Sequence, residues 1–215
     1  FNLGYLFVNK RSHAKNFYNP DQGYGINTRI KKTLNYGKFD YMKLDLDLYI
    51  NKKLGPFSIY TRHRFESIHG DNFPNQEELG IFNISNFYLM GSQTPGREYM
   101  SPRGYNGEPR KGSNAYIGSV EFRAPALPLN VIEVFRVINF GRPTVALISD
   151  FADAWTPGDN RQELIIQAGA ELRFSVLLTT LPVLTFSYGW AQSIENYKSN
   201  ITPDPYFQLT LINPF

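Results

Sequence analysis

Residues 41–50 read YMKLDLDLYI, a stretch in which apolar and polar side chains alternate at every position after Tyr41. The apolar positions are Met42, Leu44, Leu46, Leu48 and Ile50. The positions between them hold Lys43, Asp45, Asp47 and Tyr49. Because successive side chains of a β-strand point to opposite faces of the sheet, this alternation predicts a strand with one apolar face and one charged face.

The same period of two dominates the rest of the 215-residue chain, whereas the period of an α-helix is nearly absent. It predicts ten strands, at residues 2–10, 23–34, 40–51, 57–68, 79–91, 114–124, 143–155, 163–176, 183–193 and 206–213. Several of these are clearly longer than the usual strand of a globular protein, which has about five or six residues. The pattern therefore predicts an all-β, antiparallel fold that extends over residues 1–215 as one domain.

The composition argues against several classes of protein. Cysteine is absent, so the chain forms neither a disulfide framework nor a thiolate metal site. The net charge is only +3, and the basic residues form no cationic run, which argues against nucleic-acid binding. No apolar stretch approaches the length of a membrane helix. The first residues already have the pattern of a strand, so we expect the chain to be a fragment of a larger domain.

Long alternating strands have two main explanations. A water-soluble β-sandwich turns its apolar face inward, whereas an outer-membrane β-barrel turns its apolar face toward lipid and its polar face toward the lumen. Three features favour the barrel: the strands are long enough to cross a membrane, the polar faces are dense in mixed charge, and aromatic residues recur near strand ends. On this interpretation the apolar side chains of residues 42–50 face lipid, and Lys43, Asp45 and Asp47 face the lumen.

An unusually long loop, residues 92–113, precedes a strand with charged side chains on one face. On that strand, Glu121 and Arg123 lie opposite Val120 and Phe122. The motifs Arg103-Gly104-Tyr105, Glu121-Phe122-Arg123 and LISDFADAW (147–155), with a terminal aromatic residue, follow one another in the chain. In this order they resemble the C-terminal barrel of the BamA/TamA-type bacterial surface antigen superfamily, over about residues 79–215.

The resemblance implies that the long loop folds back into the barrel lumen, where its arginine meets acidic residues of the barrel wall. The residues expected in this cluster are Arg103, Gly104, Tyr105, Glu121, Arg123 and Asp150. It also implies a barrel of about sixteen strands, of which this chain supplies ten. We therefore expect an incomplete barrel with unpaired edges near Phe1 and Phe215. One departure from the family pattern is Ala152, where the family usually has Gly.

The last predicted strand ends the chain with an alternating apolar face. Its apolar residues are Phe207, Leu209, Leu211 and the terminal Phe215. This arrangement resembles the signal that the barrel assembly machinery reads in outer-membrane proteins by pairing with it as an added strand. The alternative is an ordinary edge strand.

The resemblance implies a non-enzymatic protein of the bacterial outer membrane that inserts or translocates other proteins. Its expected partners are outer-membrane lipid, lipopolysaccharide, the barrel assembly machinery and unfolded client proteins, with no nucleic acid and no cofactor. One alternative is a barrel that anchors or exports a fused N-terminal propeller or hydrolase domain. The other is a soluble β-sandwich that acts as a binding module.

Other candidate sites are explained more simply. His63, His69 and Asp71 contain the right atoms for a metal site, but a pair of histidines at the mouth of the lumen or in a loop explains them better. No serine nucleophile elbow, P-loop or dinucleotide fingerprint occurs in the sequence. We therefore expect neither a catalytic residue nor a metal site.

Overall fold

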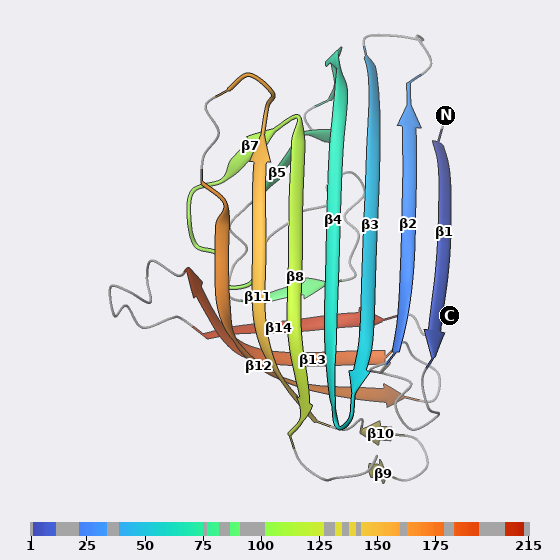
Figure 1. Ribbon diagram of the computed structural model, residues 1–215, viewed down its shortest axis with the longest axis vertical. Coiled ribbons are helices and arrows are strands. Elements are labelled where there is room, and N and C mark those ends of the chain that lie inside the picture. Colours follow the sequence, from blue (N-terminus) through green and yellow to red (C-terminus); the bar gives the residue numbers. More distant parts are fainter. Residues whose placement is uncertain are drawn as a thin grey trace.

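The structure is a computed structural model of the whole chain, and Figure 1 shows its strands. It describes residues 2–11, 22–33, 39–74, 77–81, 87–90, 102–126, 132–134, 138–140, 143–159, 163–178, 183–193 and 205–212. Strands make up most of this part of the chain, as the sequence predicts. No helix within these ranges is long and apolar enough to cross a membrane.

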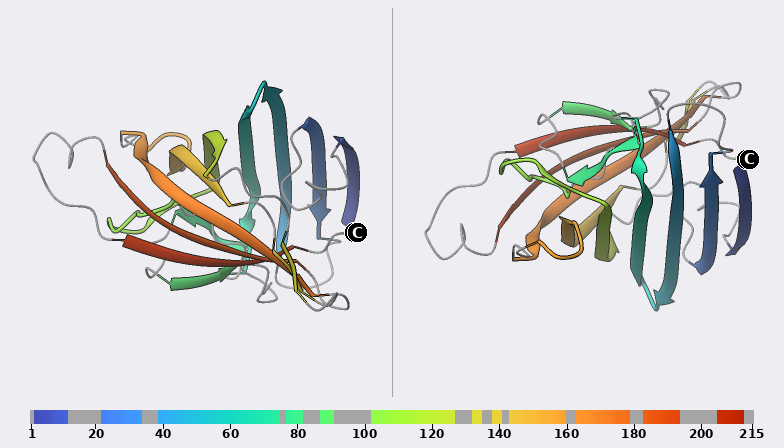
Figure 2. Two further views of the ribbon diagram at one scale, coloured as in Figure 1. Left: turned by 90° about the horizontal axis from the view of Figure 1, so that it is seen from below. Right: turned by 90° about the horizontal axis from the view of Figure 1, so that it is seen from above.

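Nine long strands form one antiparallel sheet. In spatial order they are β1 (Asn2–Arg11), β2 (Gln22–Lys32), β3 (Asp40–Leu54), β4 (Phe57–Asn72), β8 (Asn114–Pro125), β11 (Thr144–Trp155), β12 (Ile165–Leu178), β13 (Val183–Ser193) and β14 (Pro205–Ile212). Each corresponds to one of the ten predicted strands, with ends that differ by a few residues. The two end-on views in Figure 2 show that the sheet curls strongly. Over the described residues it does not close, because β1 is not paired with β14.

The remaining predicted strand, residues 79–91, is wrong as one long strand between β4 and β8. It is replaced by two short strands, β5 (Leu79–Ile81) and β6 (Phe87–Met90), and β4 pairs directly with β8. Strand β5 pairs instead with β7 (Arg110–Gly112) in a separate two-stranded sheet. This small sheet lies on the concave side of the main sheet, which we call the inner face (Figure 2).

One further connection and one sheet edge differ from the predicted topology. The long connection between β8 and β11 contains β9 (Ile132–Val134) and β10 (Ile138–Phe140), an antiparallel pair that extends the end of β12. The predicted free edge at β14 is wrong for part of its length, because β6 pairs with it in parallel, with Phe207 opposite Phe87. Phe1 and Phe215 lie outside the described residues.

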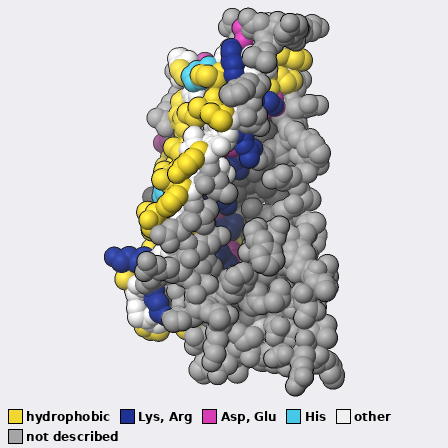
Figure 3. All heavy atoms as spheres, turned by 90° about the vertical axis from the view of Figure 1, so that its right-hand side faces the viewer, with side chains coloured by type: hydrophobic (Ala, Val, Ile, Leu, Met, Phe, Trp, Pro, Cys, Tyr) yellow, Lys and Arg dark blue, Asp and Glu magenta, His cyan; other side chains and the backbone are white. Residues whose placement is uncertain are grey.

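The outer, convex face of the sheet is apolar. Large apolar side chains that are exposed on it come from all along the sheet: Leu3, Tyr5, Phe7, Tyr24, Ile26, Ile30, Met42, Ile50, Phe57, Val120, Phe122, Val145, Leu147, Leu172, Phe174, Tyr188 and Trp190. They also contact one another across strands, as in the stacked rings of Phe57 and Phe122, whose centroids are 5.2 Å apart. Figure 3 shows such side chains gathered along one side of the molecule, with Lys and Arg in the hollow beside them.

The prediction that the apolar and charged side chains of residues 42–50 lie on opposite faces of the sheet is confirmed. On the inner face the charged residues of β3 pair with those of β4: Lys43 with Glu66 at 3.1 Å, Asp45 with Arg64 at 3.3 Å and Asp47 with Arg62 at 2.6 Å. On the outer face Met42 and Ile50 are 41% and 57% exposed. The two sides of this strand therefore have the opposite character that the alternation predicts.

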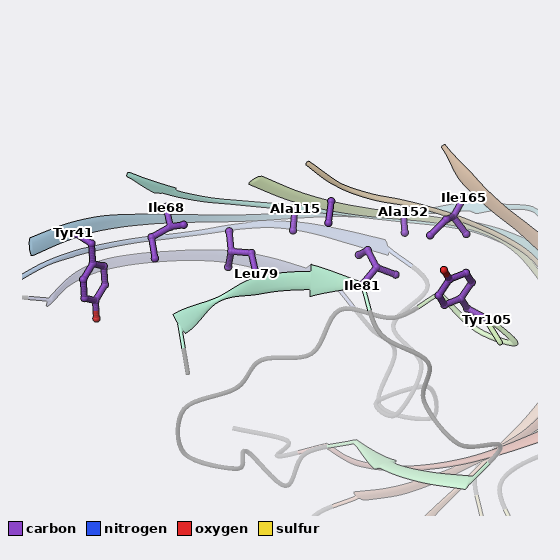
Figure 4. Close-up of a cluster of buried hydrophobic side chains, with 9 residues drawn as sticks. Tyr41, Ile68, Leu79, Ile81, Tyr105, Ala115, Ala152 and Ile165 are labelled. Carbon is purple, nitrogen blue, oxygen red and sulfur yellow. The ribbon is translucent and has the colours of Figure 1, made fainter. Parts of the chain in front are cut away.

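Part of the inner face is apolar, which the sequence did not indicate. A buried cluster joins the small sheet to the main sheet through Tyr41, Ile68, Leu79, Ile81, Tyr105, Ala115, Ala152, Ala154 and Ile165 (Figure 4). Leu79 and Ile81 are only 3% and 0% exposed. Burial of such side chains is favourable by roughly 25 cal/mol per Å² of apolar surface, which explains why β5 leaves the sheet to pack beneath it.

Candidate functional site

The charged part of the inner face surrounds Arg103. This residue lies in a turn of the loop between β6 and β7, which we call the Arg103 loop. Only 9% of Arg103 is exposed. Its backbone N–H and Nε both donate to Oδ2 of Asp150, at 2.9 and 2.8 Å, and Nη2 donates to Oδ1 at 2.6 Å. Nη1 donates to Glu121 at 2.8 Å and to Glu171 at 3.2 Å, and Nη2 also donates to Ser119 at 2.6 Å. The predicted contacts of Arg103 with Glu121 and Asp150 are therefore present.

Arg103 uses its full capacity as a donor. A guanidinium group has five N–H bonds, and the five side-chain hydrogen bonds of Arg103 engage all of them. A lysine has three donors on one atom and does not reproduce this planar fork. The site is therefore specific for arginine.

Two further arginines complete the cluster. Arg173 donates to both oxygens of Glu121, at 2.7 and 2.9 Å, and also to Glu171. Arg123 donates to Glu121 at 2.7 Å, and its guanidinium lies 4.1 Å from the centre of the Tyr60 ring. Three arginines thus face three carboxylates, and their formal charges cancel. Such balance is what a charge cluster away from water requires.

The charge state of Arg103 is fixed by this environment. Burial alone would lower the pKa of its guanidinium, but the negative charges of Asp150, Glu121 and Glu171 raise that pKa well above its ordinary value. Arg103 therefore stays protonated over the whole working range of pH.

The neighbours of Arg103 explain the Arg-Gly-Tyr order. Gly104 has φ of +70°, and a Cβ atom there would lie 2.1 Å from the carbonyl oxygen of Ala191 on β13. Tyr105 is buried in the apolar cluster, and its hydroxyl donates to the carbonyl oxygen of Glu108 at 2.5 Å. The glycine thus allows the turn to lie flat on β13, while the tyrosine anchors the return of the loop.

Replacement of Gly104 with alanine is expected to displace the loop. The left-handed conformation alone costs an L-residue about 1–2 kcal/mol, and the overlap with Ala191 adds to this cost. Limited proteolysis should cleave the loop faster in this variant than in the wild-type protein. The matched control is Gly55→Ala, because Gly55 has φ of +64° and no atom within 4 Å of the added Cβ. Equal loop cleavage in both variants would contradict the close contact with β13.

The other sequence-predicted residues whose side chains the structure describes lie apart from this cluster. Phe207 lies on β14, with its ring 6.2 Å from that of Phe186. The backbones of Leu209 and Leu211 also belong to β14, but their side chains and Phe215 lie outside what the structure describes. His63 contacts the hydroxyl of Tyr116 at 2.9 Å, and His69 contacts Ser67. Among the described side chains, Phe207 therefore packs with Phe186 and not with the arginine cluster.

No group of three or more metal-ligating side chains occurs among the described residues. The side chain of Asp71 is not among them.

Sequence reasoning missed Glu171 and Arg173. Glu171 is fully buried at 2% exposure and accepts from both Arg103 and Arg173. A signal was available, because Glu171-Leu172-Arg173 repeats the Glu-x-Arg pattern of residues 121–123 on another strand. Two strands with the same spacing of charge on the inner face indicate a shared network.

A second contact attaches the segment between β4 and β8 near its start. Glu77, just before β5, forms ion pairs with Lys31 of β2 and with Lys43 of β3, the latter at 3.7 Å. Burial alone would raise the pKa of Glu77, but the hydrogen bond and charge of Lys31 outweigh it and lower that pKa below its ordinary value. The segment between β4 and β8 is therefore held by a carboxylate at its start and by Arg103 further along.

The arrangement is suited to holding a segment in place. Its charged groups are buried and bonded to one another, and through Arg103 they attach the loop to β8, β11 and β12. Neither a protein-family model nor a curated protein matches this chain.

Proposed function

We propose that this chain is the C-terminal part of an outer-membrane β-barrel of the BamA/TamA-like surface antigen superfamily, and that it acts in inserting or translocating other proteins at that membrane. The observation that carries the proposal is the burial of Arg103 of the Arg-Gly-Tyr motif against Glu121 and Asp150. These are the contacts that the resemblance implies, and their residues come from separate parts of the chain.

The distribution of apolar side chains supports a membrane environment. In a soluble β-sandwich the apolar face of a sheet packs inward, whereas here exposed apolar side chains cover the outer face and ion pairs cover much of the inner face. Monomeric soluble proteins rarely expose apolar patches larger than a few hundred Å². Lipid is the partner that suits a surface of this extent.

The mechanism would use the terminal strand as a template. Within the part of the chain that the structure describes, the outer edge of strand β14 pairs only with the four residues of β6. An unfolded client that extends along this edge gains backbone hydrogen bonds, which need no particular client sequence. The Arg103 loop would brace the barrel from within while this edge is in use.

The proposal is tested by reconstituting the natural full-length protein in phosphatidylcholine vesicles and adding an unfolded outer-membrane barrel protein. The measured quantity is the rate at which this client becomes protease-resistant. We expect the rate to rise above that of protein-free vesicles, and Arg103→Glu to remove the increase. A rate equal to that of protein-free vesicles, or release of the protein from membranes by plain buffer, would contradict the proposal.

A further inference from the structure

Tyr206 joins the last strand to the arginine cluster. It is the second residue of β14 and is only 2% exposed. Its hydroxyl donates to Oε2 of Glu171 at 2.6 Å, and the same oxygen accepts from Nη1 of Arg103 at 3.2 Å. One carboxylate oxygen therefore contacts both the inner loop and the edge strand.

The contact crosses an intervening strand. Glu171 on β12 is paired with Gly189 on β13, and Gly189 is paired with Tyr206 on β14. A Cβ atom on Gly189 would lie 2.9 Å from the Tyr206 hydroxyl and 2.6 Å from the carbonyl oxygen of Ala170. The tyrosine reaches Glu171 because the residue between them has no side chain.

The loop also shields this contact from water. Tyr206 packs in a buried cluster with Ala146, Ile148 and Ala191. The Gly104 turn lies directly on Ala191. A hydrogen bond to a charged group is strong when water is excluded and contributes little when water competes for the acceptor. Removal of the loop would therefore weaken the bond between Tyr206 and Glu171.

We propose that Tyr206, reaching over Gly189, is a positioning residue that couples the Arg103 loop to the edge strand β14. With the loop in place, β14 is held to the sheet, and displacement of the loop loosens it. The partner that would use the loosened edge is an extended strand of an unfolded membrane protein, so this inference rests on the proposed function. Strand β6 covers part of the β14 edge and lies with Arg103 in the segment between β5 and β7. Displacement of this segment would therefore also uncover that edge.

The test measures amide hydrogen exchange of β14 in the natural full-length protein, held in phosphatidylcholine vesicles with no client added. Tyr206→Phe removes the hydroxyl and keeps the ring. The matched control is Tyr188→Phe, because Tyr188 lies on the adjacent strand with its side chain on the outer face. Arg103→Gln is then combined with each tyrosine variant. Exchange of β3 amides serves as the internal reference, because the side-chain partners of Arg103 lie on β8, β11 and β12.

We expect Tyr206→Phe to speed exchange of β14 amides about tenfold or more, the effect of one lost hydrogen bond to a charged group, with little change in Tyr188→Phe. Arg103→Gln should speed β14 exchange in the Tyr188→Phe background and much less in the Tyr206→Phe background. Exchange in Tyr206→Phe at the level of the control would overturn the coupling, as would an equal effect of Arg103→Gln in both backgrounds or no effect in either. Since no client is present, these results are independent of the client-folding rate that tests the proposed function.

Discussion

Arg103→Glu is expected to destabilise the Arg103 loop by about 3–5 kcal/mol, the usual cost of removing one partner from a buried ion pair. The variant places a fourth carboxylate beside Glu121, Asp150 and Glu171, with only Arg123 and Arg173 left to balance them. Denaturant unfolding of the detergent-solubilised protein measures the stability, and limited proteolysis reports whether residues 102–109 have left the inner face.

Milder changes at Arg103 should have smaller effects. Arg103→Ala removes the cation without adding repulsion, so its loss of stability should be below that of Arg103→Glu. Arg103→Lys keeps the charge and loses the planar fork that bonds Asp150 through two nitrogen atoms. We expect the order Lys, Ala, Glu of increasing damage. A lysine variant with wild-type stability would show that the charge alone holds the loop.

A charge exchange separates direct contact from general electrostatics. The simplest exchange combines Arg103→Glu with Glu121→Arg, but the structure argues against rescue by this pair. Glu121 also accepts hydrogen bonds from Arg123 and Arg173, so an arginine at 121 would face two cations. We expect partial rescue from Asp150→Arg instead, since Asp150 receives three hydrogen bonds from Arg103 itself. Equal rescue by both exchanges would contradict the geometry of the cluster.

The parts of the fold that the sequence predicted are those set by local alternation. A period of two along a strand states which side chains share a face, and this was sufficient for nine strands and for the facing of residues 42–50. It does not state which strands become neighbours. Residues 79–91 alternate acceptably, yet Leu79 and Ile81 gain more by burial against the inner face than by extending the sheet.

The candidate site was predictable to the extent that its residues belong to motifs. Arg103, Glu121 and Asp150 are flanked by recognisable neighbours in the chain, whereas Glu171 has only the spacing to Arg173 as a signal. The contact between Tyr206 and Glu171 depends on the register of three adjacent strands and on Gly189 lying between them. A single sequence does not determine that register, so this contact could be found only in the structure.

Ile26→Arg is the second change from which we expect a large effect. Ile26 lies on the outer face near the middle of β2 and is 40% exposed, between Phe7 of β1 and Leu48 of β3 in the register of the sheet. An arginine at the middle of the lipid-facing band of a barrel costs about 2–4 kcal/mol. We therefore expect slower assembly and lower stability in vesicles, measured as the fraction of folded protein recovered in the membrane.

The matched control is Leu54→Arg, which also introduces arginine at an exposed apolar residue. Leu54 is 42% exposed and ends β3 next to the Gly55 turn, where a barrel strand leaves the membrane. Near the membrane interface the cost of arginine falls to about 0–1 kcal/mol. In a soluble protein both residues would simply face water, and both substitutions would change stability by no more than about 0.5 kcal/mol. Only a lipid environment separates the two variants, so equal effects would show that the outer face does not contact a membrane.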